Sequence, residues 1–538
     1  VSTVPGYMGL IEDAEEAVKI SNEIGYPVMI KASAGGGGKG MRVAWNDDEA
    51  REGFQSSKNE AASSFGDDRI FIEKFITQPR HIEIQVLCDS HGNGIYLHER
   101  ECSIQRRQQK VIEEAPSPFL DAATRKAMGE QAVALAQAVD YTSAGTVEFI
   151  VDGDRNFYFL EMNTRLQVEH PVTELITGID LVEQMINVAD GAPLGIKQED
   201  VQMNGWAVES RLYAEDPYRN FLPSIGRLTK YRPPAESVSD TRVVRNDTGV
   251  FEGGEISMYY DPMIAKLCTW APTRAEAIDH MSAALDGFEI EGIGHNLPFL
   301  SAVMDHPRFV SGNITTAFIE EEYPDGFEGA PLEQAQLDKI AVASAAMYRV
   351  AEIRRSRISG RMGNHERVVG ADWVVQIADQ DFPVHIDADK SGANVTLGDA
   401  VLRVESDWVP GQTLASVTVD GVAVTLKVSD ISGGFRIRNR GADLKVYVRT
   451  PRAAELSKYM LEKVAADTSK LLLCPMPGLI VGIDVAVGDE IQEGQTLCTV
   501  EAMKMENILR AERKGVVSKI NASAGDSLAV DEVIMEFE

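Results

Sequence analysis

The stretch "GLIVGIDVAVGDEIQEGQTLCTVE" (478–501) aligns without gaps on "GVVSKINASAGDSLAVDEVIMEFE" (515–538), and this repeat decides the fold of the C-terminal end of the chain. Identical residues stand at matching places in the two copies: Gly478 and Gly515, Ile483 and Ile520, Glu501 and Glu538. Eight of the remaining pairs are apolar in both copies. Two copies of a short β-rich unit predict a small all-β barrel with approximate two-fold symmetry.

The connection between the two copies carries one lysine in apolar surroundings. In "VEAMKMEN" (500–507), Lys504 stands between Met503 and Met505. We expect this connection to form a loop or hairpin tip, with Lys504 pointing away from the small core. An ordinary solvated lysine would fit this place. Flexible methionines on both sides form an adaptable contact surface, however, which favours recognition of the lysine by a modifying enzyme.

The segment around Lys504 resembles the biotinyl domains of biotin-dependent carboxylases. The shared features are the A-M-K-M core and a P-M-P-G segment upstream, which lies here at 475–478. The resemblance implies that biotin is attached covalently to Lys504 by a biotin protein ligase. Lipoyl domains share the fold and the hairpin lysine but usually have D-K-A at this place, so the two methionines favour biotin.

The composition is that of a globular protein with several domains. The 538 residues are 44% apolar and 25% charged, as in ordinary globular proteins. A formal net charge of −31 should repel nucleic acid and anionic membranes, so neither is expected as a partner. No apolar run approaches the roughly 20 residues of a membrane helix. Five scattered cysteines without zinc or redox spacing indicate free thiols in a reducing compartment.

The pattern of apolar residues changes along the chain. Up to about residue 325, strand-like segments such as "FYFLEMN" (157–163) mix with helical ones, such as the helix expected to begin at Asp121. This mixture indicates an α/β fold. One long alanine-rich helix is predicted from residue 332 on, followed by short alternating strands. The Asp420-Gly421 pair between two of them is typical of a two-residue hairpin, so the middle predicts a helix plus an antiparallel sheet or barrel.

The sequence "KASAGGGGKG" (31–40) is a candidate phosphate-binding loop. Glycines let backbone N–H groups approach a phosphate closely. The segment is not a Walker A loop, because no Ser or Thr follows Gly38 and Lys39. A flexible loop without a ligand would also fit. Lys31, on the strand just before the glycines, favours the hypothesis of a mobile lid over ATP.

Oxygen-bearing side chains gather where "EMNTRLQVEH" (161–170) begins. Glu161 and Asn163 alternate at the end of a predicted strand, and Glu148 lies on the strand before it. Two carboxylates and an amide suit Mg²⁺ or Mn²⁺ held together with substrate phosphates. A charged strand end that faces solvent would show the same residues.

The alternation continues beyond this strand through Arg165, Gln167 and Glu169. An arginine can hold a small planar anion through paired hydrogen bonds, and a carboxylate nearby can take a proton from it. These spacings permit a site for a small anion but do not require one.

A second segment, "IQRRQQKVIEEAP" (104–116), is cationic in an acidic chain. It concentrates Arg106, Arg107 and Lys110, which suggests a local pocket for an anionic ligand. Pairing of these cations with Glu113 and Glu114 at the surface is the alternative explanation.

Five segments, in this order, resemble the biotin carboxylase member of the ATP-grasp family: "PRHIEIQVL", "QRRQQKVIEEAP", "FLEMNTRLQVEHPVTE", "VESRLYAEDP" and "MYYDPMIAKL". The resemblance covers about 1–325. It implies contacts to ATP from Lys31, Gly35, Gly36, Gly37, Gly38, Glu73, His81 and Gln105. It implies metal binding by Glu148, Glu161 and Asn163, and bicarbonate binding by Lys110, Arg165, Gln167 and Val168. Glu169 would be the base that deprotonates bicarbonate, and Arg211 would stabilise biotin as its ring nitrogen becomes nucleophilic.

Two departures from the family pattern are visible. Many relatives have histidine where Gln108 stands, and glutamine cannot carry charge, so a phosphate contact there is expected to be weaker. Family members also carry a further α/β subdomain before the segment that matches Val1, which supplies another lysine to ATP. We therefore expect the chain to be N-terminally incomplete.

These features predict a multidomain chain. The expected parts are an ATP-grasp lid at 1–76, the C-terminal subdomain of biotin carboxylase at 77–325, a helix plus antiparallel β-barrel at 326–465 that docks a carboxyltransferase subunit, and a flattened-barrel biotin carboxyl carrier domain at 470–538. The expected cofactors are covalent biotin, ATP and Mg²⁺ or Mn²⁺, with bicarbonate as a substrate. The expected location is the bacterial cytoplasm, or the mitochondrial matrix for a eukaryotic chain.

The resemblance also bears on the acyl acceptor. No carboxyltransferase domain is recognised in this chain, which argues against a single-chain pyruvate carboxylase and implies a partner β subunit in an α6β6 assembly. Segments such as "EEYPDGFEGAPL" resemble the α subunits of biotin-dependent acyl-CoA carboxylases that act on propionyl-CoA and give methylmalonyl-CoA. Enzymes for methylcrotonoyl-CoA, or for acetyl-CoA and propionyl-CoA together, are alternatives. A carrier and docking subunit with an inactive carboxylase half is another, and a lipoyl carrier would not need the ATP-grasp motifs.

Overall fold

The computed structural model describes the chain in these stretches: 1–7, 9–33, 41–65, 68–257, 259–357, 359, 367–460, 470–502 and 505–538. Lys504 and the glycines at 35–38, which are predicted site residues, lie outside them. Among the described residues, no helix combines the length and the apolar character that a membrane crossing requires. Tertiary contacts divide the chain into two compact units, 1–209 with 312–324 and 210–311 with 325–538.

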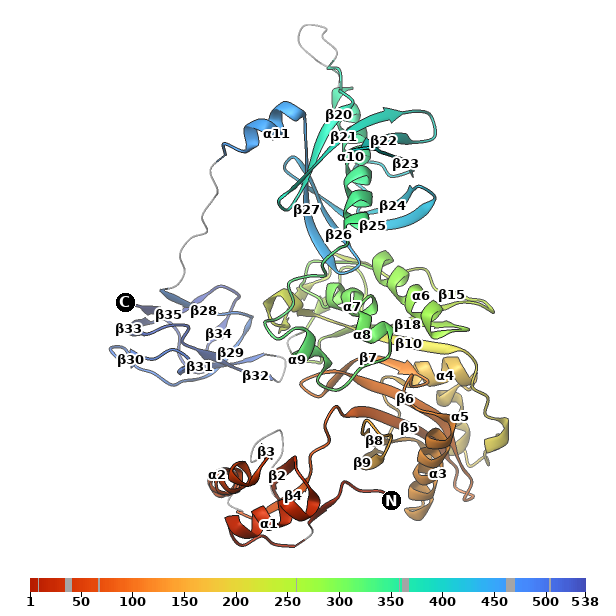
Figure 1. The fold of residues 1–538 in the computed structure, drawn as a ribbon, viewed down its shortest axis with the longest axis vertical. Coiled ribbons are helices and arrows are strands. Elements are labelled where there is room, and N and C mark those ends of the chain that lie inside the picture. Colours follow the sequence, from red (N-terminus) through yellow and green to blue (C-terminus); the bar gives the residue numbers. More distant parts are fainter. Residues whose placement is uncertain are drawn as a thin grey trace. The chain divides into compact units, whose positions relative to one another are not determined.

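The first unit begins with a small α/β layer, which Figure 1 shows in red. Its strands are hydrogen-bonded in the order β1-β4-β2-β3, and its two helices contact them. The elements are β1 (Gly6–Tyr7), α1 (Ala14–Ile24), β2 (Val28–Ala32), β3 (Met41–Ala44), α2 (Asp47–Phe65) and β4 (Ile70–Lys74). Alternate residues of β2 are buried, Val28 and Ile30 among them, so Lys31 faces away from this core.

An antiparallel sheet forms the centre of the first unit, with strand order β7-β6-β5-β8-β9. Its strands are β5 (Arg80–Cys88), β6 (Gly94–Arg106), β7 (Gln109–Ala115), β8 (Ser143–Val151) and β9 (Phe157–Asn163). The further helices of this unit are α3 (Ala122–Ala138), α4 (His170–Thr177), α5 (Leu181–Ala189), α9 (Phe318–Glu322) and the 3₁₀ turn Gln198–Asp200. The predicted N-cap is confirmed: the Asp121 carboxylate accepts a hydrogen bond from the backbone N–H of Thr124 at 2.8 Å.

The two faces of this sheet differ in character. Ile82 and Ile84 of β5 and Val147 of β8 pack in one hydrophobic core with residues of α3. Successive side chains of a strand point to opposite faces. The odd-numbered residues of β5 and the even-numbered residues of β8 therefore lie on the other face, where polar side chains collect.

The second unit begins with an antiparallel sheet of order β15-β16-β18-β10 and three helices. The sheet contains β10 (Trp206–Tyr213), β15 (Ser237–Val238), β16 (Val243–Thr248) and β18 (Met263–Ala271). Short paired strands are β11 (Glu215–Asp216) with β12 (Leu222–Pro223), β13 (Gly226–Arg227) with β17 (Glu255–Ile256), and β14 (Lys230–Arg232) with β19 (Glu289–Glu291). The helices are α6 (Arg274–Gly287), α7 (Leu297–Met304), α8 (Pro307–Val310) and the 3₁₀ turn Pro217–Arg219.

A closed antiparallel barrel follows, which decides between the two predictions for the middle of the chain. Its strands are β20 (Asp372–Ile377), β21 (Gln380–Ala388), β22 (Ala393–Leu397), β23 (Ala400–Ser406), β24 (Leu414–Val419), β25 (Val422–Ile431), β26 (Gly434–Asn439) and β27 (Ala442–Arg449). The predicted hairpin is confirmed: Asp420 and Gly421 join β24 to β25 with φ values of 48° and 79°.

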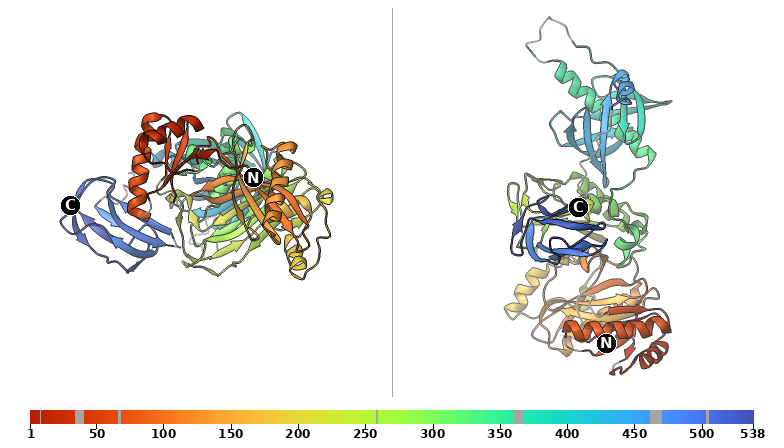
Figure 2. Two further views of the ribbon diagram at one scale, coloured as in Figure 1. Left: turned by 90° about the horizontal axis from the view of Figure 1, so that it is seen from below. Right: turned by 90° about the vertical axis from the view of Figure 1, so that its left-hand side faces the viewer.

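The long helix α10 (Gln334–Ser356) belongs to the core of this barrel. It contacts β20 to β24, β26 and β27, and Figures 1 and 2 show it among the barrel strands. Residues 340–345 are all buried, so the helix is enclosed on every side there. Its alanines explain how the strands can approach it closely. The short helix α11 (Pro451–Ser457) ends this part.

The C-terminal repeat folds as two equivalent four-stranded sheets. One has the order β28-β35-β33-β30 and the other β32-β31-β29-β34. The strands are β28 (Leu471–Leu473), β29 (Gly478–Ile483), β30 (Glu490–Ile491), β31 (Thr496–Ala502), β32 (Met505–Arg510), β33 (Gly515–Ile520), β34 (Ser527–Leu528) and β35 (Val533–Phe537). Strands β33, β34 and β35 begin at the residues that the gapless alignment matches to the starts of β29, β30 and β31. The predicted two-fold symmetry is confirmed, and both sheets share one core.

A buried lysine joins the barrel to helix α6. Lys427 lies on β25 between the inward-facing Leu426 and Val428, so it points out of the barrel, and its ammonium donates to the carbonyl oxygen of Leu285 at 2.7 Å. Burial lowers the pKa of Lys427 to about 8, with Arg438 acting in the same direction, although Asp286 and Glu289 act to raise it.

This lowered pKa predicts a pH dependence of stability. The unfolded lysine keeps its proton up to about pH 10.4, so between about pH 8 and pH 10 the unfolded chain binds more protons and stability rises with pH. Lys427→Met removes this gain, which is worth about 3 kcal/mol in full. Thermal unfolding of both proteins from pH 7.5 to 10 measures it. Lys445→Met, at an exposed site of β27, is the matched control, and a parallel pH response of all three proteins would contradict the prediction.

Candidate active site

The polar face of the central sheet carries a row of charged residues across four strands. In the strand register, Arg100 stands opposite Glu83, Glu83 opposite Glu148, and Glu148 opposite Glu161. Directly opposed residues of antiparallel strands lie on the same face, and like charges there repel one another. Three neighbouring carboxylates can therefore persist only where cations compensate them.

A β-bulge brings the last carboxylate of this row onto the polar face. Phe157 and Phe159 of β9 pack with the α3 core, so strict alternation would turn Glu161 to the same side. The register shifts between the pairs Glu148–Glu161 and Phe149–Phe159, where β9 has one extra residue. Beyond the shift, Met162 packs with the α3 core and Glu161 faces the row. Such bulges re-aim side chains beside functional sites.

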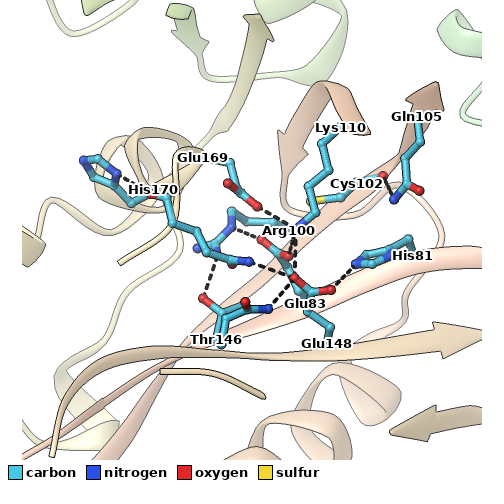
Figure 3. Close-up of polar contacts among 12 residues, drawn as sticks. His81, Glu83, Arg100, Cys102, Gln105, Lys110, Thr146, Glu148, Glu169 and His170 are labelled. Carbon is cyan, nitrogen blue, oxygen red and sulfur yellow. Dashed lines mark hydrogen bonds and ion pairs between the residues drawn. The ribbon is translucent and has the colours of Figure 1, made fainter. Parts of the chain in front are cut away.

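Lys110 is the cation at the centre of the cluster (Figure 3). Its ammonium pairs with Glu83, with Glu148 at 3.1 Å and with Glu169 at 2.6 Å. Burial acts to lower the pKa of Lys110, but the surrounding acidic groups, Glu83 foremost, outweigh burial and raise it. Lys110 therefore stays charged. Lys110 pairs with these three buried carboxylates. The alternative explanation, surface pairing with Glu113 and Glu114, therefore does not hold for Lys110.

Two carboxylates of the row, Glu83 and Glu148, stay ionised in turn. Burial acts to raise the pKa of Glu83, but Arg100 and Lys110 outweigh burial and hold it at about 2. Burial likewise acts to raise the pKa of Glu148, and hydrogen bonding from His81 and the charge of Lys110 lower it instead. Nε2 of His81 lies 3.0 Å from Glu148. The site is therefore a dense charged network in a buried setting, where electrostatic interactions are strong.

The segment after β9 is a loop, not a continuation of the strand, so the predicted alternation there is wrong. The strand ends at Asn163, and Pro171 near the start of α4 fixes where the helix begins. Arg165 is exposed, whereas Gln167 and Glu169 are buried in the cluster. Glu169 is the N-cap residue of α4, and its carboxylate reaches Lys110 from there.

The remaining predicted residues divide between the units. Lys31 and Glu73 form an ion pair with each other on β2 and β4. Gln105 donates to the carbonyl oxygen of Cys102 at 2.8 Å, and Val168 lies half-buried in the loop before α4. Arg211 lies on β10 in the second unit, where it is buried and its guanidinium donates to Tyr213 at 3.4 Å.

Glu148, Glu161 and Asn163 fit a divalent metal ion. Nδ2 of Asn163 donates to Glu148 at 3.0 Å and to Glu161 at 3.3 Å, so one amide reaches both carboxylates. Hard oxygen donors of this kind suit Mg²⁺ or Mn²⁺. The atoms of His81, Glu83 and Glu148 also lie within 4.8 Å of one another, but both oxygens of Glu83 are already held by cations. Both oxygens of Glu148 also contact basic groups, Lys110 and His81, so Glu161 is the carboxylate of this set that makes no ion pair among the described residues.

Sequence reasoning missed two buried members of the cluster, Glu83 and Arg100. Both are fully buried. Glu83 lies two residues after His81 on β5 and hence on the same face, which was a usable signal. Arg100 lies in "HERECS" (98–103), where the sequence pattern predicts that a charged residue of a strand is exposed to solvent. Gln108, the departure from the family pattern, lies exposed in the two-residue turn between β6 and β7.

Four family models match successive parts of the chain. They are the ATP-binding domain of the carbamoyl-phosphate synthase L chain at 1–197, the biotin carboxylase C-terminal domain at 209–321, the propionyl-coenzyme A carboxylase BT domain at 340–463, and the biotin-requiring enzyme domain at 470–537.

Curated relatives and a solved structure agree with these matches. A propionyl-CoA carboxylase alpha chain of Ruegeria pomeroyi is 76% identical over 100% of this chain and 81% of the relative. A mitochondrial methylcrotonoyl-CoA carboxylase subunit alpha of Rattus norvegicus is 38% identical over 100% of this chain and 76% of the relative. The biotin carboxylase domain of Hydrogenobacter thermophilus 2-oxoglutarate carboxylase, solved with MgADP, ADP and bicarbonate, is 47% identical with a TM-score of 0.53, over 60% of this chain and 70% of that one.

Proposed function

The chain belongs to the family of propionyl-CoA carboxylase alpha chains, and from this premise we propose how its own residues divide the work of carboxylating biotin. The protein is a biotin-dependent carboxylase, a ligase that uses ATP and bicarbonate. A carboxyltransferase β subunit is its partner and passes the carboxyl group to propionyl-CoA, which becomes methylmalonyl-CoA.

The observation that supports these roles is the row of charged residues on the central sheet, with Lys110 at its centre. Lys110 holds bicarbonate beside Glu169, which takes its proton, and Arg165 and Gln167 orient the anion. The bicarbonate oxygen then attacks the γ-phosphorus of ATP, ADP leaves, and carboxyphosphate forms where water is excluded. Val168, in the same loop, is also assigned to bicarbonate binding. Arg211 steadies the developing charge on biotin.

Further residues hold ATP and the metal. We assign Lys31, Glu73, His81, Gln105 and the glycines 35–38 to ATP. Glu148 and Glu161, with Asn163 beside them, would hold Mg²⁺ or Mn²⁺. The metal, when bound, neutralises charge on the transferred phosphate, and biotin on Lys504, when attached, supplies the ring nitrogen that accepts the carboxyl group. The chain's residues position these groups.

The assembly and the domain limits complete the proposal. We assign 1–76 to the lid, 77–325 to the rest of the carboxylase, 326–465 to docking of the β subunit, and 470–538 to the carrier. We expect the chain to assemble with the β subunit as an α6β6 dodecamer and to be modified by a biotin protein ligase. We expect a bacterial cytoplasmic location, and the Ruegeria relative favours a bacterial source.

The proposed function predicts ATP cleavage that depends on bicarbonate and on a divalent metal. The full-length protein should release phosphate from ATP only when both are present, and should carboxylate free biotin. Glu161→Gln should raise the Mg²⁺ concentration for half-maximal cleavage by about tenfold or more, because the metal loses a charged ligand.

The control is Glu183→Gln, the same substitution at an exposed site of α5, which should leave the Mg²⁺ dependence unchanged. Weak or absent bicarbonate-dependent ATP cleavage would overturn the assignment and favour a carrier and docking subunit with an inactive carboxylase half. An unchanged Mg²⁺ requirement in Glu161→Gln would move the metal away from Glu161.

A further inference from the structure

Arg100 is a buried guanidinium whose N–H groups are all engaged. The side chain has five N–H donors, and it is fully buried on β6. Nε donates to Glu83 at 2.5 Å, Nη1 to Gln85 at 2.7 Å and Thr173 at 2.9 Å, and Nη2 to Thr146 and Gln167, both at 3.1 Å. Five acceptors from two strands, a loop and a helix thus meet at one residue.

Stability alone does not account for this arrangement. A buried charge costs desolvation energy even when it is paired, and a well-packed apolar side chain often stabilises a core at least as well. What a saturated planar guanidinium adds is geometry, because its five donors point in fixed directions. Arg100 therefore fixes the orientation of the side chains that it binds.

Gln167 is the member of this network whose orientation decides its chemistry. Its Oε1 accepts from Arg100 at 3.1 Å, and its Nε2 donates to the carboxylate of Glu148 at 2.8 Å. A flipped amide would turn its NH₂ toward the donor-only guanidinium and its oxygen toward the carboxylate, so both contacts forbid the flip. The second N–H of Nε2, which makes no hydrogen bond among the described residues, can donate to an anion and not to a cation.

We propose that Arg100 is a positioning residue for bicarbonate, which acts by holding the Gln167 amide with its N–H toward the anion. This inference rests on the proposed function, in which Gln167 orients bicarbonate. Arg100 itself does not touch the substrate. It aligns a donor for the anion beside Lys110 before the anion arrives.

Arg100→Lys tests the proposal, because lysine keeps the charge and the pairing with Glu83 but has no planar fork to reach Gln167. In bicarbonate-dependent ATP cleavage by the full-length protein, the KM for bicarbonate should rise about tenfold, as expected for one lost charge-assisted hydrogen bond. The KM for ATP should stay within about threefold. A role in stability alone would not separate these two constants.

Two further variants make the result specific. Arg125→Lys is the matched control, because Arg125 also binds a buried carboxylate, Glu99, through two N–H groups at 2.7 and 2.8 Å. It should lower the melting temperature without moving the KM for bicarbonate. In a Gln167→Ala background, Arg100→Lys should raise that KM by less than about threefold, because residues that act through one another are not additive.

Each outcome decides the proposal. An unchanged KM for bicarbonate in Arg100→Lys, or full additivity with Gln167→Ala, overturns it. If Arg100→Lys does not fold, Thr146→Val decides: it removes one acceptor of the same Nη2 group, and a bicarbonate KM raised about two- to fivefold supports the proposal while an unchanged KM overturns it. A wild-type protein whose ATP cleavage ignores bicarbonate overturns the proposed function and this inference with it.

Discussion

Replacing Lys504 with arginine is expected to abolish carboxylation of propionyl-CoA completely and to leave carboxylation of free biotin at the wild-type rate. Biotin is joined to the chain through an amide, and forming that bond needs an amine that can lose its proton. Arginine stays protonated in proteins and is not such a nucleophile. The carboxylase half, in contrast, does not use Lys504 for its own chemistry.

The two activities are measured separately in one preparation. Fixation of labelled bicarbonate with propionyl-CoA and the β subunit reports the whole reaction, and labelling of added biotin reports the first half. Lys519→Arg, at an exposed site of β33 in the same domain, is the control. It should keep both activities, and its intact mass should still include one attached biotin. Overall activity that survives in Lys504→Arg would remove the carrier role from this residue.

The strands on either side of Lys504 follow from the local repeat, which is why they could be predicted, whereas Lys504 itself lies outside the described residues. The repeat sets the strands of both copies at matching positions, and the described strands β31 and β32 end at Ala502 and begin at Met505. We expected the connection between the copies to form a loop or hairpin tip, and its described part agrees, since β32 pairs antiparallel with β31 as in a hairpin. The hairpin at Asp420 and the helix start at Asp121 were equally local, because each depends on a few neighbouring residues.

The carboxylase cluster was only partly predictable, because its geometry depends on contacts between distant residues. The bulge in β9 has no signature in "FYFLEMN", so alternation alone would leave Glu161 and Asn163 facing α3 with Phe157 and Phe159. Arg100 has partners that stand from 15 to 73 residues away in the sequence. No periodicity encodes such a network, and a single charged residue within a strand looks the same whether it is solvated or saturated with buried acceptors.

The second large effect is expected for Glu169→Gln, which should lower the rate constant of bicarbonate-dependent ATP cleavage by about 10²- to 10⁴-fold, as for loss of a general base. Glutamine has the shape of glutamate but cannot take the proton of bicarbonate. Lys110 loses one of its three carboxylates, yet Glu83 and Glu148 still hold it and still raise its pKa. The cation that binds the substrate therefore remains in place.

This separation of roles makes the prediction sharp. Equilibrium binding of ATP to Glu169→Gln should match the wild type, because the substitution leaves Lys31, His81 and the metal carboxylates untouched. Glu174→Gln, on the same helix α4, is the matched control, because the Glu174 carboxylate accepts a structural hydrogen bond from the backbone N–H of Leu181 at 3.0 Å. It should keep the full rate. A rate constant in Glu169→Gln within about tenfold of the wild type would assign the proton transfer to another group.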